Sequence, residues 1–413
     1  MTDSIIKKLT VDQYSELARI VFHAYPSPEK GSLEDCENWC KNEIEKGEGK
    51  LYGAFRDNQL LGGMIVYDFK MNLLSTAINA GGTGLVCVDF LHKKEKVAKD
   101  LINFFLNHYR SRNINMALLY PFNIAFYKKM GFGYGAKIYQ YRVHPINFPN
   151  QCTRDGIVYL GKKDQEKVIE CYQRFHQKTN GSIIRLNYQW NKIFHPNATI
   201  IGYQKEGQIL GYMIFEFERV NDNFHMFNLA IKEIVYESTE ALFKICAFIN
   251  SQSDQIRQVI INTFDEFLFH ILTDPRNGSY SAFKNRCHEI STIGTGVMYR
   301  LINVKGIFNE LQSHNFGNQN CKIAITVKDS FIKDNEGTTI VDFHKGIAQV
   351  VDNSDYEVMI RLDVSDFSSL FVGAVDFLTL YNYGLAEITD LNYLDIVNDI
   401  FKVKQKPICL SWF

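Results

Sequence analysis

The first third of the chain alternates between apolar residues at strand spacing and apolar residues at helical spacing. This pattern predicts a strand at residues 5–10, helices that begin at Asp12 and cover 34–45, and a hairpin that turns at 56–59. It further predicts a strand near 73–78, a buried strand at 81–89, a helix at 97–106, a strand at 114–120 and a short helix at 123–130. The order is that of an α+β domain with one parallel crossover.

A similar order of elements recurs after a proline-containing linker at residues 144–150. It comprises a helix at 164–178, strands at 198–203, 209–217 and 228–236, a helix that begins after Ser238, and a strand at 258–262. The loop before this second helix carries Glu237, Ser238 and Glu240 where the first copy carries lysines. Carboxylates there would repel phosphates, and Ser238 is a typical helix N-cap. We therefore interpret the second copy as a structural repeat without a cofactor.

A third segment follows, with predicted strands at residues 321–328, 338–344, 347–351 and 358–362 and helices that begin at 363 and at 392. The chain closes on Pro-Ile-Cys-Leu-Ser-Trp-Phe at 407–413, which is too apolar for a frayed tail. An anchor in a core or in an oligomer interface is the simplest reason for such an end. We expect three domains, at 1–145, 146–296 and 297–413.

The loop at residues 92–96, His-Lys-Lys-Glu-Lys, lies between the predicted buried strand and the helix that follows it. The first N–H groups of a helix lack internal partners, and the helix dipole there favours anions. The loop therefore fits a diphosphate cradle, but it fits equally an ordinary crossover whose lysines lie in solvent. From these residues alone the ordinary crossover is favoured.

Composition and charge narrow the class of protein. The chain has 413 residues, a net charge of -1, 46% hydrophobic and 22% charged residues, which is typical of a globular protein with more than one domain. Near-neutral charge gives no support for a nucleic-acid or membrane-surface function. The chain contains no apolar run of about 18 residues and no apolar signal core near Met1, so we expect a cytoplasmic protein.

The cysteines and histidines do not form a ligand pattern. Nine scattered cysteines are typical of thiols in a reducing compartment, and Cys36 and Cys40 share a helical face without further Cys or His ligands downstream. The eleven histidines contain no HExxH motif. We predict no metal.

The whole chain resembles the acetyltransferases of the enhanced-intracellular-survival (Eis-like) family, which belong to the GNAT superfamily. The resemblance rests on residues 81–88 before the crossover loop, on Phe-Tyr-Lys-Lys-Met-Gly-Phe-Gly-Tyr at 126–134, on 366–373, and on the closing Ser-Trp-Phe. The resemblance covers essentially the full length of the chain, and it lies in the order and spacing of the motifs more than in residue identity. It implies two tandem GNAT domains, the second degenerate, a C-terminal sterol-carrier-protein-like α+β domain, and a homo-oligomer, commonly a hexamer.

The resemblance also implies an active site. Tyr127 matches the general acid that protonates the leaving thiolate, and the carboxylate of Phe413 matches the terminal group that reaches the first domain's site. Coenzyme A would lie on residues that match the family's strand and loop, namely Val86, Val88, Lys93, Lys94, Lys96 and Val97. The chain departs from the family where Lys96 replaces the central glycine of the loop. Judged from its own neighbourhood, Tyr127 fits a core aromatic on a short amphipathic helix.

The expected reaction is acetyl transfer from acetyl-CoA to an amine, either an aminoglycoside-like polyamine or a lysine side chain. A free α-carboxyl group has a pKa of about 3.5, so Phe413 suits positioning of an ammonium, with water taking the proton, better than direct deprotonation. Tyr25, Trp39 and Trp412 are candidates for the acceptor pocket. We expect no nucleic-acid or membrane partner. The alternative is a degenerate family member with weak coenzyme A binding that acts as a scaffold or as a carrier of an apolar ligand.

Overall fold

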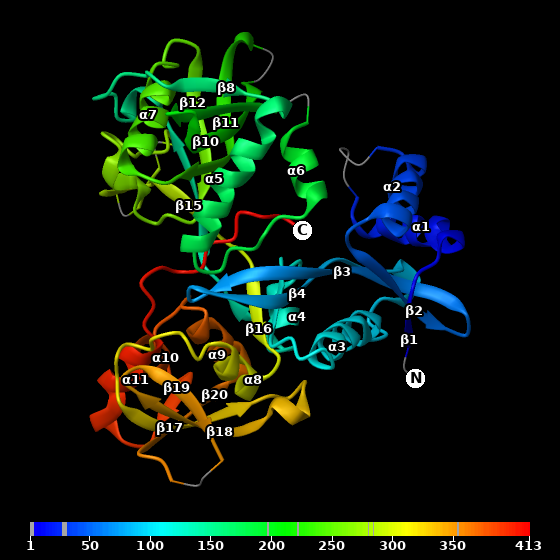
Figure 1. Cartoon of the computed structure of the whole chain (residues 1–413). Helices are drawn as coiled ribbons and strands as arrows, with labels where there is room; N and C mark the ends of the chain where they lie inside the picture. The colour runs from blue at the N-terminus through cyan, green and yellow to red at the C-terminus, as the bar shows by residue number, and fades with distance from the viewer. Residues whose placement is uncertain are drawn as a thin grey trace. The chain divides into compact units, whose positions relative to one another are not determined.

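The computed structural model describes residues 4–26, 31–195, 198–220, 223–279, 281–283, 285–352 and 355–413. They form two compact units. Unit 1 comprises Met1–Gly135 and Val297–Phe413, and unit 2 comprises Ala136–Gly296 (Figure 1). Unit 1 therefore contains both ends of the chain, and the middle of the chain folds as a unit of its own.

The first part of unit 1 is a seven-stranded sheet with the strand order β1-β2-β3-β4-β5-β16-β6. Its strands are β1 (Ile5–Lys8), β2 (Lys50–Arg56), β3 (Gln59–Leu73), β4 (Thr76–Val88), β5 (Met116–Leu119), β16 (Met298–Leu301) and β6 (Gly133–Tyr134). Strands β4 and β5 are parallel and the other neighbours are antiparallel. The parallel crossover predicted from the sequence is thereby confirmed.

The predicted separate strand at residues 73–78 is wrong. Leu74 and Ser75 form the turn between β3 and β4, with left-handed φ angles of 50° and 66°. The strand pattern continued through this point because Leu73 and Leu74 are both buried although the chain reverses direction there. The turn joins two long strands, β3 and β4, and residues 76–78 are the first part of β4 and not a strand of their own.

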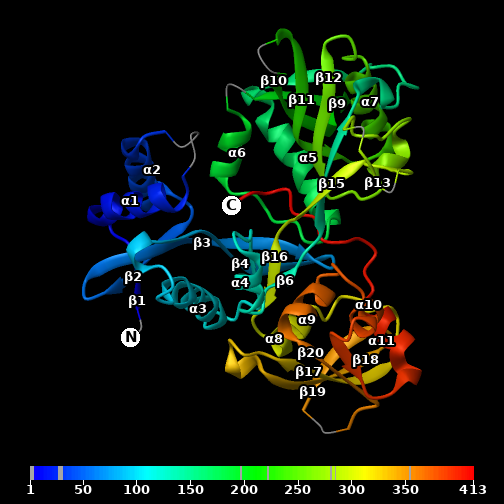
Figure 2. The same ribbon diagram turned by 180° about the vertical axis from the view of Figure 1, so that it is seen from behind.

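Helices cover both faces of this sheet, namely α1 (Tyr14–Ala24), α2 (Leu33–Lys46), α3 (Val97–Arg110) and α4 (Ile124–Lys128) (Figure 2). Adjacent glycines of β3 show the arrangement, because successive Cβ directions point to opposite faces of a strand. A Cβ on Gly62 would meet Val97 of α3 at 3.1 Å, and one on Gly63 would meet Leu17 of α1 at 2.7 Å. Helices α1 and α3 therefore pack on opposite faces of the sheet. Because Gly62 has no side chain, Val97 of α3 can approach β3 closely at this position.

The C-terminal part of unit 1 is a five-stranded sheet with the order β19-β18-β17-β20-β21. Its elements are β17 (Cys321–Lys328), β18 (Gly337–His344), β19 (Ile347–Val351), β20 (Val358–Asp363), β21 (Ala386–Ile388), α8 (Val304–Glu310), α9 (Val364–Phe371), α10 (Phe377–Asn382) and α11 (Leu394–Phe401). The four predicted strands of this segment are confirmed. Helix α9 packs against β16 and β6 and so joins the C-terminal part to the first sheet.

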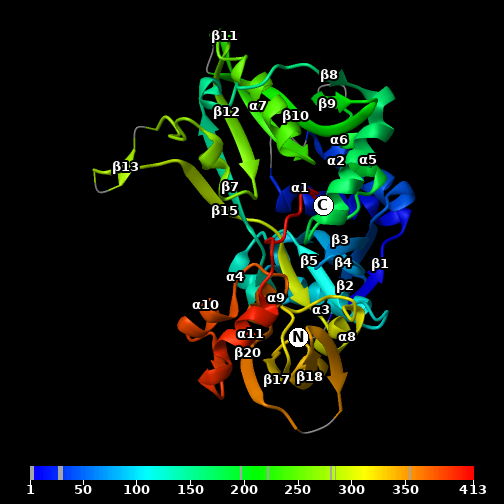
Figure 3. The same cartoon turned by 60° about the vertical axis from the view of Figure 1, so that its left-hand side comes forward.

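Unit 2 contains a second seven-stranded sheet with the order β15-β7-β12-β11-β10-β9-β8 (Figure 3). Its elements are β7 (Lys137–Val143), β8 (Ile157–Leu160), β9 (Thr199–Lys205), β10 (Gln208–Val220), β11 (Asn223–Tyr236), β12 (Ile256–Thr263), β15 (Ser291–Thr295), α5 (Gln165–Lys178), α6 (Asn187–Ile193), α7 (Thr239–Asn250) and a small ribbon of β13 (Ala282–Phe283) and β14 (Cys287–His288). Strands β11 and β12 are parallel and α7 connects them, as α3 connects β4 and β5. The predicted repeat of the layout is confirmed.

Near each of the two predicted domain borders, at residues 145 and 296, one strand belongs to a sheet on the other side of the border. Strand β7 lies before residue 145 and pairs with β12 and β15 in unit 2. Strand β16 lies after residue 296 and pairs with β5 and β6 in unit 1. The division into three domains at 145 and 296 stays a prediction.

No helix of the described residues is long and apolar enough to cross a membrane. Within the same ranges, no three His, Cys, Asp or Glu side chains gather in a way that could hold a metal ion.

Candidate active site

The first sheet separates at the middle of β4. The parallel pairing with β5 runs from Ala80 to Thr83. On the β3 side, the register shifts between Gly63 and Ile65, which face Cys87 and Gly84, so β4 carries a bulge. Leu85 sits in this bulge with a φ of 51°. A bulge leaves backbone groups out of the ladder and turns the strand. Here it takes Leu85 and Val86 out of the register with β3, while Cys87 and Val88 pair with β3 again and lie beyond the end of the pairing with β5.

A cavity of about 750 Å³ opens at this separation, walled by the end of β4, the loop before α3, and α4. Several residues proposed from the sequence line it, namely Tyr25, Val86, Val88, Lys93, Lys94, Lys96, Val97 and Tyr127. Others that line it were not among the site residues proposed from the sequence, namely Ala24, Cys87, His92, Ala98, Lys99, Phe122, Asn123, Phe126, Lys129, Met130, Ser330 and Phe331. Lys99 could have been found from its place one helical turn after Lys96, whereas Ser330 and Phe331 have no local signal.

The wall of the cavity is strongly basic. Its five lysines are Lys93, Lys94, Lys96, Lys99 and Lys129, and no carboxylate is among the described residues that line it. Within the described chain none of these lysines makes an ion pair. No described side chain caps the start of α3, where backbone N–H groups seek an acceptor. The cavity therefore attracts anions, and phosphates in particular.

Lys96 takes the N-cap position of α3 with φ 69° and ψ 2°, which is the left-handed conformation. Glycine is the residue that adopts this conformation without a steric cost, and other residues lose about 1 kcal/mol or more there. The backbone thus keeps the conformation that a glycine would give, although the residue is lysine. Lysine in place of the family's glycine therefore adds a positive charge to the loop, and the backbone at this position keeps its left-handed conformation.

Glu95 lies in the same loop but does not line the cavity. Its Oε2 accepts a hydrogen bond from Arg56 Nη1 at 2.6 Å and lies 3.3 Å from His92 Nδ1. These two hydrogen bonds lower the pKa of the Glu95 carboxyl. The carboxylate is therefore occupied by Arg56 and does not neutralise the lysines.

Tyr127 and Tyr25 add phenol groups to the wall of the cavity. Tyr127 is held on α4, whose first turn is capped by Asn123 through Phe126 N at 3.0 Å. It is 5% exposed, and burial raises its pKa to about 12. The hydroxyl of Tyr25 donates to Val86 O at 2.8 Å, beside the bulge of β4. Tyr127 is therefore protonated at neutral pH and able to donate a hydrogen bond.

The chain end reaches the same strand. The carboxyl carbon of Phe413 lies 3.2 Å from the place that a Cβ on Gly84 would take. The Phe413 ring packs edge-on against Phe69 with 4.8 Å between centroids, and Trp412 stacks on Tyr120 at 4.6 Å. Gly84 precedes the cavity-lining Val86 by two residues, so the terminal carboxylate meets β4 next to the site.

Two further candidates lie apart from the residues that line this cavity. Trp39 is on α2 and is 39% exposed, and Trp412 is 60% exposed on the chain end. Their role as acceptor-pocket residues stays a prediction.

The corresponding helix start in unit 2 is satisfied by its own side chains. Ser238 Oγ accepts from Ala241 N at 3.2 Å, which confirms the predicted N-cap. Glu237 receives hydrogen bonds from Arg174 at 2.8 and 3.0 Å, and Glu240 receives one from Tyr203 at 2.7 Å. Caps and carboxylates occupy the position at which unit 1 presents lysines. Of these two described helix starts, the one in unit 1 is therefore the one that suits an anion.

The sequence matches three domain models. An acetyltransferase (GNAT) domain matches residues 5–135, a second acetyltransferase (GNAT) domain matches 181–301, and a sterol carrier protein domain matches 305–410. The predicted fold class, with two mixed-sheet domains of this type and a C-terminal α+β domain, is thereby confirmed. A search of curated protein sequences finds no match.

Several solved structures share the fold over the whole chain. A GCN5-related N-acetyltransferase from Anabaena variabilis is 19% identical with a TM-score of 0.83 and covers 99% of this chain and 100% of its own. A probable N-acyltransferase from Enterococcus faecalis is 19% identical, with a TM-score of 0.78 and 100% of both chains covered. Eis1 from Mycobacterium abscessus is 16% identical with a TM-score of 0.78, and the match covers 99% of this chain and 100% of the Eis1 chain.

Proposed function

We propose that this chain is an Eis-like GNAT acyltransferase that transfers the acetyl group of acetyl-CoA to the nitrogen of an amine. The observation that carries the proposal is the basic cavity at the separated end of β4, with Tyr127 in its wall and the Phe413 carboxylate beside it. When bound, acetyl-CoA supplies an activated acetyl thioester. The remaining requirements, namely binding, orientation and proton transfer, fall to residues of this chain.

The donor set of the cavity fits coenzyme A. Lys93, Lys94 and Lys96, together with the first N–H groups of α3 near Val97, would hold the diphosphate by charge and hydrogen bonds. Val86 and Val88 would present β4 backbone to the pantetheine arm. The end of β4 supports this role, because its pairing with β5 stops at Thr83 and the bulge takes Val86 out of the register with β3.

Tyr127 is the proposed general acid. As the amine nitrogen bonds to the carbonyl carbon and the carbon–sulfur bond breaks, Tyr127 would donate its proton to the sulfur. The proton that the amine loses would restore the phenol through water. Free tyrosine has a pKa of about 10 and a thiol about 8.5. The burial that raises the pKa of Tyr127 also disfavours a thiolate in the same place, so the two groups stay closely matched.

The Phe413 carboxylate is proposed to position the acceptor. A carboxylate beside Gly84 would attract an ammonium and align its nitrogen once water has removed the proton. The acceptor is then an amine that is cationic in solution, either a polyamine of the aminoglycoside kind or a lysine side chain, with Tyr25, Trp39 and Trp412 as candidate contacts. A homo-oligomer, commonly a hexamer in this family, is part of the same proposal.

Binding of acetyl-CoA tests the proposal directly. Calorimetric titration should show one site per chain at micromolar cofactor, and a panel of amine acceptors with thiol detection should then show acetyl-dependent release of coenzyme A. Absence of binding at high micromolar acetyl-CoA would contradict the enzyme function. It would point instead to a scaffold or to a carrier of an apolar ligand.

Extending the chain by one alanine after Phe413 should lower kcat/KM for the amine by about 100-fold, because a carboxylate displaced by about an ångström or more no longer aligns the acceptor. Affinity for acetyl-CoA should stay unchanged, since Phe413 is not among the residues that line the basic cavity. Steady-state kinetics and calorimetry measure the two effects. Unchanged turnover in the extended protein would remove Phe413 from the site.

Gly84→Ala examines the same group without a change at the terminus. The new Cβ would lie 3.2 Å from the carboxyl carbon of Phe413, so the terminus must shift by a few tenths of an ångström. We expect a smaller fall in kcat/KM than in the extended protein, in the same direction. Gly161→Ala is the matched control, because a Cβ there meets nothing within 4 Å and its φ of -134° suits any residue. Equal activity of both glycine variants would contradict the positioning role.

A further inference from the structure

A loop of the C-terminal domain forms part of the wall of the basic cavity. The loop follows β17, and both Ser330 and Phe331 line the cavity. Ile332, the next residue, is only 4% exposed and belongs to the same hydrophobic core as α3 and β5. The sterol-carrier-like domain is thus built into the wall of the cleft in the acetyltransferase domain.

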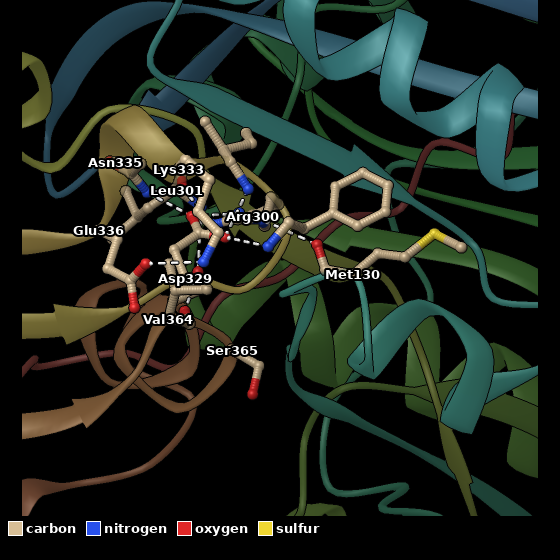
Figure 4. A network of polar contacts seen from close by, with 12 residues as sticks. Met130, Arg300, Leu301, Asp329, Lys333, Asn335, Glu336, Val364 and Ser365 are labelled. Carbon is tan, nitrogen blue, oxygen red and sulfur yellow. Dashed lines mark hydrogen bonds and ion pairs between the residues drawn. The ribbon is translucent and has the colours of Figure 1, made fainter. Parts of the chain in front are cut away.

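A buried ion pair fixes this loop. Asp329 Oδ1 accepts hydrogen bonds from Phe331 N at 3.1 Å and Ile332 N at 2.9 Å, and its Oδ2 accepts from Arg300 Nη2 at 2.5 Å (Figure 4). Asn335 donates to the same Oδ2 at 2.9 Å. The loop therefore holds its shape through bonds of its own before a ligand arrives, which lowers the entropic cost of binding.

The same network also reaches a second segment that lines the cavity. Arg300 Nε donates to Met130 O at 3.0 Å, and Met130 lines the cavity after Tyr127. Both side chains of the ion pair are 0% exposed. Arg300 therefore connects the end of α4 to the loop that carries Phe331.

Phe331 faces a lysine of α3. Lys99 Nζ lies 5.7 Å from the centroid of the Phe331 ring, and both residues line the cavity. Phe331 is partly buried against the core, and Lys99 is exposed. An aromatic ring in a fixed loop, beside an ammonium that makes no ion pair with the described residues, suits a planar group that carries a phosphate.

Coenzyme A has such a group at one end. Its diphosphate joins the pantetheine arm to an adenosine that carries a 3′-phosphate. If the diphosphate lies at the start of α3 and pantetheine follows β4 towards Tyr127, the adenosine must extend from the diphosphate away from β4. Lys99, in the first turn of α3, and Phe331 lie next to that start.

We propose that Phe331 and Lys99 form the adenosine end of the cofactor site, with the Phe331 ring against the adenine and the Lys99 ammonium on the 3′-phosphate. This rests on the proposed use of acetyl-CoA. It gives the C-terminal domain a role in cofactor binding that is separate from its supply of the chain end. Arg300 and Asp329 act as positioning residues for the loop.

The test is calorimetric binding of coenzyme A and of dephospho-coenzyme A, which lacks only the 3′-phosphate. Phe331→Ala should weaken the binding of both ligands by the same factor, about 5- to 150-fold, the usual effect of removing an aromatic partner of a base. Lys99→Ala should weaken coenzyme A by about tenfold and leave dephospho-coenzyme A unchanged. Wild-type protein should prefer coenzyme A, and Lys99→Ala should lose this preference.

Phe331→Tyr keeps the ring and should restore affinity to within about threefold of wild type, which separates stacking from a general loss of packing. If both alanine variants bind the two ligands like wild type, the adenosine end lies elsewhere, although the proposed reaction stands. If Phe331→Tyr is as weak as Phe331→Ala, the ring is not the contact. If wild-type protein binds neither ligand, the proposed function itself fails.

Discussion

Replacing Tyr127 with phenylalanine is expected to lower kcat by about 10²- to 10⁴-fold, the usual contribution of a positioned general acid. The variant keeps the ring that packs in the core and removes only the hydroxyl, so the fold and the affinity for acetyl-CoA should change little. Stopped assays of coenzyme A release give kcat, and calorimetry gives the affinity. A kcat within about threefold of wild type would exclude Tyr127 as the acid.

The pH dependence sharpens this prediction. Because burial raises the pKa of Tyr127 to about 12, the phenol stays protonated up to about pH 10. The ratio of wild-type to Tyr127→Phe turnover should therefore be constant between about pH 7 and pH 9.5. A ratio that falls as pH rises within this range would mean that the hydroxyl ionises earlier and that its environment differs from the one described.

Tyr134→Phe is the matched control. Tyr134 follows α4 on β6, is 41% exposed, and is outside the residues that line the cavity. Its hydroxyl can be removed with little effect on packing or charge. Loss of activity in this variant similar to that of Tyr127→Phe would show that the region tolerates no substitution, and not that Tyr127 donates a proton.

The sequence identifies much of the cavity because its central parts are local. Val86, Val88, Lys93 and Lys96 lie within one strand–loop–helix segment that the hydrophobic spacing predicts. Their role in cofactor binding came from the family resemblance, because the residues alone favoured an ordinary crossover. The layout of the second copy follows from the same spacing. Tyr127 required the family resemblance as well, because a single tyrosine on a short helix has no distinctive pattern.

Contacts between distant segments could not be read in this way. Glu95 lies among the lysines in the sequence, but it pairs with Arg56, which stands 39 residues earlier in the β2–β3 hairpin. Ser330 and Phe331 reach the cavity because β17 ends beside the first domain's core. Strand β16 belongs to the first sheet although all of unit 2 lies between it and the earlier strands in the sequence. No hydrophobic periodicity, helix cap or turn motif in the sequence predicts these contacts.

Arg300 shows most clearly how much depends on such a distant contact. Replacing it with methionine is expected to lower the free energy of unfolding by about 3–5 kcal/mol, because the change leaves the buried Asp329 carboxylate without its partner. Methionine restores part of the volume, so the loss comes mainly from the unpaired charge. Urea unfolding followed by circular dichroism measures the effect. Lys305→Met, which breaks the exposed pair with Asp352, should leave stability nearly unchanged.

The sign of the pH dependence distinguishes the charge from simple packing. Burial alone would raise the pKa of Asp329, but Arg300 and the N–H of Ile332 hold it below its ordinary value. In wild type this group therefore stabilises the fold above about pH 4 and loses that contribution only as pH falls through its lowered pKa. Without Arg300, burial dominates and raises the pKa of the carboxyl, so the folded variant gains a proton as pH falls.

The stability difference between wild type and Arg300→Met should consequently shrink between pH 8 and pH 5. Adding Asp329→Asn should recover part of the loss at pH 8, because asparagine keeps an acceptor for Phe331 N and Ile332 N and removes the charge. A difference that is constant with pH and unaffected by the second substitution would mean that Arg300 acts by packing alone. In the expected case, one buried pair both stabilises unit 1 and fixes the loop that completes the cofactor cavity.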